Sequence, residues 1–169
     1  DVSPDNSWQL TIYDSGFSTP SWVQNAVIYQ IFPDRFRDGD SANNPTAGNF
    51  FYGNNDTVVR SNTTNWNAPI CDPRSNAGSS FVCGGIYSQN FYGGDLQGII
   101  DQLPYLDSLG VTALYLNPIF ESPSNHKYDT TDFFVVDDNF GDLADFQALA
   151  TAANALGINI ILDGVFNHS

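Results

Sequence analysis

The sequence predicts an α/β fold with a parallel sheet, because strongly apolar, β-forming runs alternate with helical patterns along the chain. The runs are short and nearly continuous, which is typical of strands that are buried on both faces. They occupy residues 26–32, 111–118 and 158–162. The order strand, insert, helix, strand, loop, helix, strand indicates consecutive βαβ units.

The segment before the first buried run predicts a separate β element. Residues Trp8–Asp14 alternate apolar and polar side chains, as a half-buried strand does, and a linker follows. We therefore expect residues 1–20 to be the tail of a preceding β segment and residues 21–169 to form the parallel α/β domain. A polar insert at about 38–92 interrupts this domain and is long enough to need a function or a tether.

Both helices are predicted from apolar residues at helical spacing. In the first pattern, residues 94–110, Gly110 is a stop signal and Pro104 is expected to kink or restart the helix. The second pattern, residues 141–157, ends at Gly157. Its predicted inward face consists of Leu143, Phe146, Leu149, Ala150, Ala153 and Leu156.

Polar residues follow each predicted strand, namely Asp34, Arg35, Asn117, Asp163, Asn167 and His168. In a parallel α/β protein, ligands bind at the carboxyl ends of the strands. Two architectures fit the pattern, a doubly wound sheet and a (β/α)₈ barrel. A dinucleotide site is disfavoured, because no G-x-G-x-x-G turn follows the first strand.

The composition excludes some classes of partner. The net charge of −14 argues against nucleic acid, which needs clustered Lys and Arg. No run approaches the ~18 apolar residues of a membrane span. Every acidic residue except Glu121 is Asp; these carboxylates either keep the protein soluble or bind a hard cation such as calcium. The chain lacks an initial Met and a signal-peptide pattern, so we expect a processed or excised piece.

The two cysteines, Cys71 and Cys83, flank a polar loop in the insert. They either form a local disulfide, which implies an oxidising compartment, or remain free buried thiols. We favour the disulfide, because the segment is expected to be exposed and the rest of the chain has no Cys. Two cysteines are too few for a four-ligand zinc site. Trp66 lies in the same insert and is either a platform for a sugar or a residue that packs the loop.

The stretch "RDGDSANNP" is the best metal-binding candidate. Asp38, Asp40, Asn43 and Asn44 place several side-chain oxygens within seven residues, which suits a hard cation. The stretch is not an EF-hand, because Ala42 occupies the fifth position and no Glu closes the loop. The alternative is a turn rich in Asp and Asn that binds no metal.

Four stretches carry a specific resemblance: "VIYQIFPDRF", "FYGGDLQGIIDQLPYLDSLGVTALYLNPIF", "SPSNHKYDTTDFF" and "ILDGVFNH". Together they resemble the opening of the catalytic barrel of the α-amylase family of glycoside hydrolases, most closely its neopullulanases, pullulan-hydrolysing α-amylases and amylopullulanases. The resemblance covers about residues 20–169. It implies the first three βα units of a (β/α)₈ TIM barrel, incomplete in this chain, so residues 21–169 would be the N-terminal part of the catalytic domain.

The resemblance also implies a function. The protein would be part of an extracellular, secreted α-glucan hydrolase. It would hydrolyse α-1,4 glucosidic bonds in starch, pullulan or cyclodextrins with retention of configuration. The resemblance leaves open whether it also hydrolyses α-1,6 bonds. The family's catalytic Asp and Glu residues follow later strands, so no catalytic residue is expected here. The rest of the barrel is then an expected partner. The alternative is a non-hydrolytic relative that binds carbohydrate or serves a transporter. A free-standing binding domain is disfavoured by the open sheet edge.

Individual roles follow from the same resemblance. Tyr128 would stack under the sugar at the scissile bond, His168 would hydrogen-bond that sugar, and Asp163 would shape the site. The alternatives are a core tyrosine and a structural histidine. His126 and Lys127, beside Tyr128, would line the cleft. The implied calcium ligands are Asp38, Asp40, Asn43, Asn44, the carbonyl of Gly93, Asp95 and, in calcium-dependent members, Asn167.

Overall fold

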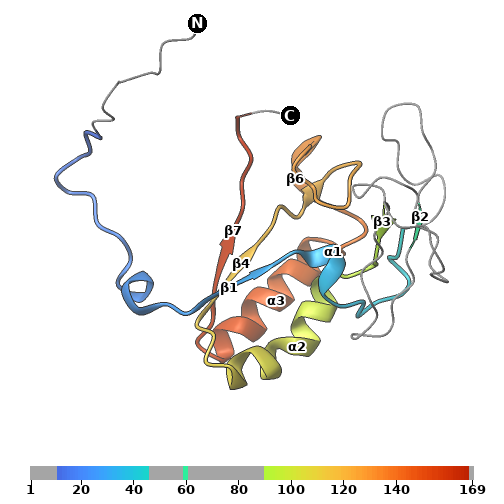
Figure 1. Cartoon of the computed structure of the whole chain (residues 1–169), viewed down its shortest axis with the longest axis horizontal. Helices are drawn as coiled ribbons and strands as arrows, with labels where there is room; N and C mark the ends of the chain where they lie inside the picture. Colours follow the sequence, from blue (N-terminus) through green and yellow to red (C-terminus); the bar gives the residue numbers. More distant parts are fainter. Residues whose placement is uncertain (1–10, 46–58, 61–89, 168–169) are drawn as a thin grey trace, which may run out of the picture.

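The three buried runs form one parallel sheet in the computed structural model, which describes residues 11–45, 59–60 and 90–167 (Figure 1). The strands are β1 (Ile28–Ile31), β4 (Ala113–Leu116) and β7 (Asn159–Leu162), in the order β1-β4-β7. Every neighbouring pair is parallel. The predicted α/β fold is therefore present, with β1 and β7 at the two edges of this sheet.

The register decides which strand residues share a face. Gln30 pairs with Tyr115, and Tyr115 pairs with Ile161, so these three side chains lie in one row. Because successive side chains on a strand point to opposite faces, the neighbours of this row point the other way. Those neighbours, Ile31, Leu114 and Leu116 among them, belong to the hydrophobic core.

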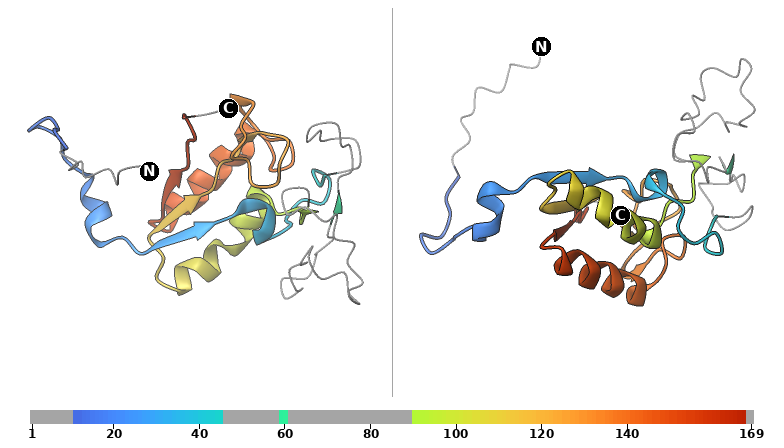
Figure 2. Two further views of the ribbon diagram at one scale, coloured as in Figure 1. Left: turned by 45° about the horizontal axis from the view of Figure 1, so that its top comes forward. Right: turned by 90° about the horizontal axis from the view of Figure 1, so that it is seen from below.

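Two helices cover the core face of the sheet. They are α2 (Leu96–Ser108) and α3 (Leu143–Ala155), and they lie side by side on the same side of the strands (Figures 1 and 2). Their fully buried residues are Leu96, Ile99, Leu103, Leu106, Leu149 and Ala153. The other face of the sheet, which carries the Gln30–Tyr115–Ile161 row, has no helix packed on it among the described residues.

Helix α2 runs unbroken through Pro104, so the predicted restart is wrong, while the predicted kink stays a prediction. Proline removes one backbone hydrogen bond and crowds the preceding turn. Pro104 is exposed, so the carbonyl that loses its donor lies on the side of the helix that water reaches. The helix begins at Asp95, whose carboxylate accepts a hydrogen bond from the Gly98 N–H.

Helix α3 buries a narrower face than predicted. Leu149 and Ala153 are buried, whereas Leu143 is 62% exposed and Leu156 is 41% exposed. The expectation that all six apolar residues point inward is therefore wrong for the two outermost leucines. The residues in the middle of the helix reach the core, whereas no described element covers the two outer leucines. A capping box of Asp142 and Asp145 fixes the first turn.

The remaining elements are short. They are η1 (Ser21–Asn25), α1 (Pro33–Phe36), the parallel pair β2 (Val59–Arg60) and β3 (Asn90–Phe91), and the antiparallel pair β5 (Phe120–Glu121) and β6 (Asp132–Val136). The strand predicted at 8–14 is wrong over residues 11–14, which are exposed and have no regular structure. No described strand lies beside them to supply hydrogen bonds. The boundary at residue 20 stays a prediction.

Among the described residues, none of the helices combines the length and apolar character that crossing a bilayer requires.

Candidate active-site face

The carboxyl ends of the three parallel strands meet at one edge, as predicted. There the Gln30 side-chain N–H₂ donates to the Asn117 side-chain oxygen at 2.8 Å, which joins the ends of β1 and β4. Asp163 follows β7, and its backbone N–H donates to Leu116 O at 3.0 Å. This edge brings together polar groups that are far apart in the sequence.

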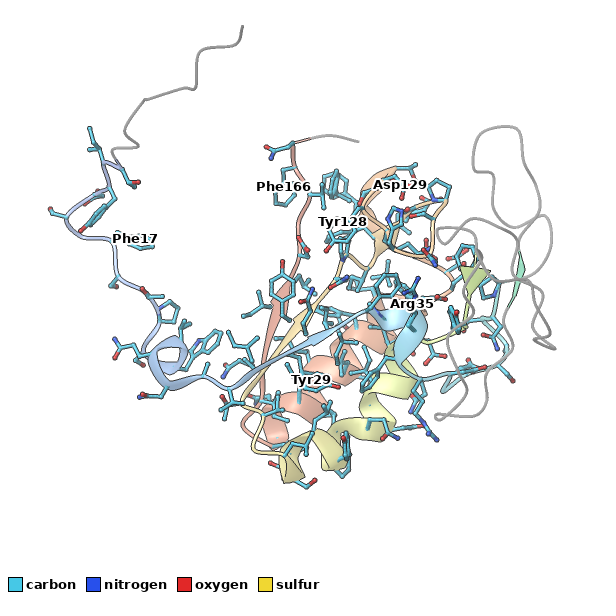
Figure 3. The ribbon with its side chains drawn as sticks, in the orientation of Figure 1. Phe17, Tyr29, Arg35, Tyr128, Asp129 and Phe166 are labelled. Atoms are coloured by element: carbon cyan, nitrogen blue, oxygen red, sulfur yellow. The ribbon has the colours of Figure 1, made fainter. Side chains whose placement is uncertain are left out.

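The hydroxyl of Tyr128 donates a hydrogen bond to Asp163 Oδ2 at 2.9 Å. Tyr128 lies on the loop between β5 and β6, beside Asp129 and above the strand ends (Figure 3). Burial, and after it the hydrogen bond to Asp163, raises the pKa of Tyr128 to about 12. The phenol therefore stays protonated at neutral pH and remains a hydrogen-bond donor.

Tyr115 is a second phenol at Asp163, and the sequence analysis did not single it out. The neighbouring Asp163 carboxylate is the main reason why the pKa of Tyr115 is raised. The alternation of strand β4 places Tyr115 on the face opposite the core, in the row with Gln30. This alternation is the sequence signal that could have identified Tyr115 as a residue of the site. Asp163 thus accepts the Tyr128 hydroxyl and has the Tyr115 phenol as a neighbour.

His126 lies next to Tyr128, and its place in a cleft stays a prediction. The same expectation for Lys127 is wrong, because its side chain is fully buried against Asp137. The ring centroids of His126 and Tyr128 are 5.9 Å apart. Nδ1 of His126 accepts the Tyr128 backbone N–H at 3.1 Å and lies 3.0 Å from Ser124 Oγ. Burial is the main cause that lowers the pKa of His126, so the neutral imidazole is favoured.

Asp34 has a structural role at the end of β1. Its carboxylate is 2% exposed and accepts the backbone N–H groups of Tyr92 and Gly93 at 3.0–3.1 Å. Burial raises its pKa to about 7 although these donors act in the opposite direction. Arg35 has its guanidinium over the rings of Phe32 and Tyr92. Both residues fasten the end of β1 to the segment before α2.

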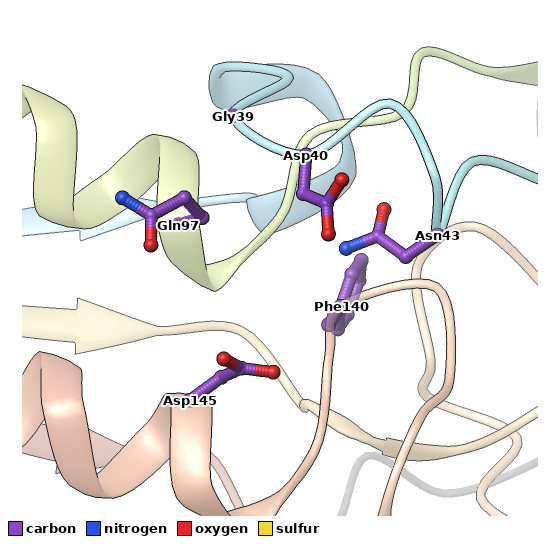
Figure 4. Close-up of a pocket in the computed structure, with 6 residues that line it drawn as sticks. All are labelled: Gly39, Asp40, Asn43, Gln97, Phe140 and Asp145. Atoms are coloured by element: carbon purple, nitrogen blue, oxygen red, sulfur yellow. The ribbon is translucent and has the colours of Figure 1, made fainter.

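The predicted metal-binding loop folds around Asp95. The Asp95 carboxylate accepts the backbone N–H of Gly39, the N–H of Asp40 at 2.7 Å, and the Asn43 side-chain N–H₂ at 3.3 Å. The structure therefore brings the loop and the start of α2 together, as the resemblance implies. Beside them is a cavity of about 210 Å³, lined by Gly39, Asp40, Asn43, Gln97, Phe140 and Asp145 (Figure 4).

Three amide oxygens near this loop are buried without a hydrogen-bond partner among the described residues. They belong to Asn43, Asn44 and Asn139. The Asn44 side-chain N–H₂ donates to Asp38 at 2.8 Å, and that of Asn139 donates to Asn43 O at 2.9 Å. Buried acceptors without donors are costly, and a hard cation removes that cost.

Gly93 is required for the approach of Asn44. Its φ is +80°, and a Cβ at this position would lie 2.9 Å from Asn44 Cγ and would overlap the amide oxygen. The side chain of Asn44 therefore occupies space that only glycine leaves open. No group of three or more His, Cys, Asp or Glu side chains gathers around a common point in the described residues. A cation at this loop would depend on amide and backbone oxygens as well as carboxylates.

Several predicted site residues are not part of these contacts. Asn167 is exposed after β7, and no hydrogen bond joins it to the loop at 38–44. His168, Trp66, Cys71 and Cys83 lie outside the described residues, so the histidine contact and the disulfide stay predictions. Asn139 was missed because a single Asn before Phe140 carries no sequence signal.

Residues 30–169 match the family described as "Alpha amylase, catalytic domain". The chain belongs to this family. The predicted family is thus confirmed, and so is the predicted fold, since the three parallel strands with α2 and α3 correspond to the start of the family's (β/α)₈ barrel.

Individual relatives agree with this assignment. The chain is 52% identical over 163 residues to an amylopullulanase of Thermoanaerobacterium saccharolyticum, a match that covers 96% of this chain and 12% of the relative. It is 48% identical over 153 residues to neopullulanase 2 of Thermoactinomyces vulgaris, and this match covers 90% of this chain and 21% of the relative.

Among solved structures, the type III pullulan hydrolase of Thermococcus kodakarensis superimposes with a TM-score of 0.69 and 36% identity, over 85% of this chain and 23% of that one. The α-amylase-family segment described here therefore spans only a small part of the length of these relatives.

Proposed function

We propose that this chain contributes substrate-binding residues to an α-glucan hydrolase of the α-amylase family. The observation that carries the proposal is the Tyr128–Asp163 hydrogen bond at the carboxyl edge of the sheet. It presents an aromatic ring beside a fixed carboxylate, and a flat sugar face packs well on such a ring. The relatives named amylopullulanase, neopullulanase and pullulan hydrolase support starch-like substrates and pullulan.

The chain's own residues bind and orient the sugar in this proposal. Tyr128 stacks under the ring, His126 lines the cleft, and Asp163 holds Tyr128. His168 is proposed to hydrogen-bond the same sugar. Retaining hydrolysis needs two carboxyl groups about 5 Å apart, one as nucleophile and one as acid/base. Those groups are proposed to follow later strands of the barrel, and the remainder of the barrel is the partner that supplies them.

The alternative is a non-hydrolytic relative that binds carbohydrate or serves a transporter. Such a protein has no need for a tyrosine held by a strand-end carboxylate, which favours the enzyme. The test uses the complete polypeptide that contains this chain, with maltoheptaose and pullulan as substrates. Release of reducing sugar, with the α-anomer as first product by NMR, supports a retaining hydrolase. Binding of maltoheptaose without hydrolysis supports the alternative.

Calcium fits the loop around Asp95 and is proposed as a structural cofactor. Asp38, Asp40, the amide oxygens of Asn43 and Asn44, and the carbonyl of Gly93 would hold the ion, with Asp95 between the loop and α2. The buried amide oxygen of Asn139 makes it a further candidate. The bound ion would hold the polar insert against α2 and supplies no step of the chemistry.

The calcium proposal has a direct test in the complete polypeptide. Removal of calcium with a chelator should lower the thermal midpoint, and added calcium should restore it. The Asp38→Ala variant should lose most of that response. Asp101→Ala, on the exposed face of α2, is the matched control and should keep it. An unchanged midpoint after chelation would refute calcium binding.

A secreted location is also proposed, supported by the two cysteines in a polar insert and by the acidic composition. Mass spectrometry of a non-reduced digest tests it through the disulfide. A peptide that links Cys71 to Cys83 supports an oxidising compartment, and two free thiols in freshly isolated protein contradict it.

A further inference from the structure

Lys127 is the single lysine of the chain, and it is fully buried. Its Nζ lies 2.7 Å from Asp137 Oδ2 and donates to Ser122 O at 3.1 Å. The rings of Phe91 and Phe140 have their centroids 5.6 and 5.2 Å from the same nitrogen. A buried charge of this kind persists only when a partner and hydrogen bonds compensate for lost hydration.

The backbone of Lys127 is unusual as well. Its φ is +60°, and it is the only non-glycine residue with a positive φ among the described residues. Side chains with a Cβ adopt this left-handed conformation rarely, so the surrounding contacts must hold it. The Lys127 N–H donates to Ser124 Oγ at 3.1 Å, and its carbonyl accepts from Thr130 Oγ1 at 3.0 Å.

This conformation sets the directions in which the side chains of residues 126–128 point. The side chain of Lys127 points into the core, whereas Tyr128 reaches Asp163 at the strand edge. His126 accepts the Tyr128 N–H and lies against its ring. The position of the Tyr128 ring thus depends on the turn at Lys127.

Asp137 anchors the other side of the pair. Its Oδ2 also accepts the Ser122 N–H at 3.1 Å, and its Oδ1 accepts the Asn139 N–H at 3.0 Å. The Asp137 N–H donates to Ile119 O at 2.9 Å. The carboxylate therefore connects the beginning of the loop, the lysine in its middle, and the segment that leaves β6.

We propose that Lys127 and Asp137 form a buried clamp that positions Tyr128 for the sugar. They are positioning residues, because neither reaches the strand edge where the sugar would bind. The inference rests on the proposed function. It assigns specificity for the sugar partly to an ion pair in the core beneath the loop.

The test is a double-mutant cycle in the complete polypeptide with maltoheptaose as substrate. Lys127→Met or Asp137→Asn should lower kcat/KM by about tenfold when Tyr128 is present. In a Tyr128→Ala background the same substitutions should change kcat/KM by less than about twofold, since the residue through which they act is gone. Asp137→Asn conserves the shape of the side chain, so the cycle can be measured with this variant if Lys127→Met does not fold.

Leu106→Ala is the matched stability control, because Leu106 is fully buried in α2 and far along the chain from the loop. It should lower the thermal midpoint without changing kcat/KM at a temperature where the variant is folded. Equal losses of kcat/KM in the wild-type and Tyr128→Ala backgrounds overturn the clamp while the hydrolase stands. Absence of hydrolysis by the wild-type protein overturns the proposed function and the clamp with it.

Discussion

Gly98→Ala should destabilise the protein, although glycine in a helix is ordinarily improved by alanine. Gly98 lies in the first turns of α2, where helix propensity alone predicts a gain of about 1 kcal/mol. A Cβ at this position, however, would overlap the carbonyl oxygen of Arg37 and lie 2.6 Å from its carbon. These are backbone atoms, so no rotation of a side chain relieves the overlap.

The size of the destabilisation follows from the backbone atoms of Arg37 that must move to admit the new Cβ. Overpacking a well-packed contact costs about 1–3 kcal/mol. A shift of the Arg37 carbonyl also weakens the Asp95 N–H to Arg37 O hydrogen bond of 3.0 Å and the Gly39 N–H to Asp95 contact, at about 1 kcal/mol each. After the propensity gain is subtracted, we expect a net loss of about 2–4 kcal/mol.

Gly110→Ala is the control for this substitution. A Cβ at Gly110 meets nothing within 4 Å, but the φ of +78° costs about 1 kcal/mol for a residue with a side chain. Both variants of the complete polypeptide are to be melted with and without calcium. We expect both midpoints to fall, and only Gly98→Ala to weaken the calcium response. A higher midpoint for Gly98→Ala than for the wild type would refute the packing argument.

Three further predictions concern the strand edge and the core. Tyr128→Phe keeps the ring but removes the donor to Asp163, so kcat/KM on maltoheptaose should fall by roughly tenfold, and an unchanged value would remove the hydrogen bond from the mechanism. Leu114→Ala, at a fully buried position of β4, should lower the free energy of unfolding by about 2–5 kcal/mol. A smaller loss would mean that neighbouring side chains move to fill the cavity left by the leucine. Because burial lowers the pKa of His126, its stabilising contribution should be lost as the pH falls below about 6.5. His126→Gln should therefore flatten the midpoint-against-pH curve there, and an equally steep curve would count against a buried neutral imidazole.

The strands and helices of the sheet were predictable because their signals are local and strong. Continuous apolar runs identified β1, β4 and β7, and glycine stops marked the ends of both long helices. Pro104 led to the wrong prediction of a restart because proline was read as a break signal, whereas a proline on the exposed side of a helix is accommodated within it. The two outer leucines of α3 were predicted wrongly because periodicity gives the direction of a side chain but not whether another element covers it.

The candidate site was predictable only in part. The polar strand ends and the loop around Asp95 were found, since carboxylates and amides in short range are visible in the sequence. The Lys127–Asp137 pair was not, because ten residues and a strand separate the two partners and a lysine in a polar loop ordinarily faces solvent. Whether Tyr128, Asp163 and the loop residues bind sugar and calcium stays a prediction.

The strand order has a consequence for how such a barrel is made. β1 lies at an edge of the sheet, with Val27 and Ile28 each about half exposed. In a closed (β/α)₈ barrel, the free side of the first strand pairs with the last strand. At roughly 5–20 residues per second, the ribosome needs several seconds to supply the later βα units. During that interval the first strand of the barrel still has an unpaired edge, so this edge is the last part of the ring to be protected from pairing with other chains.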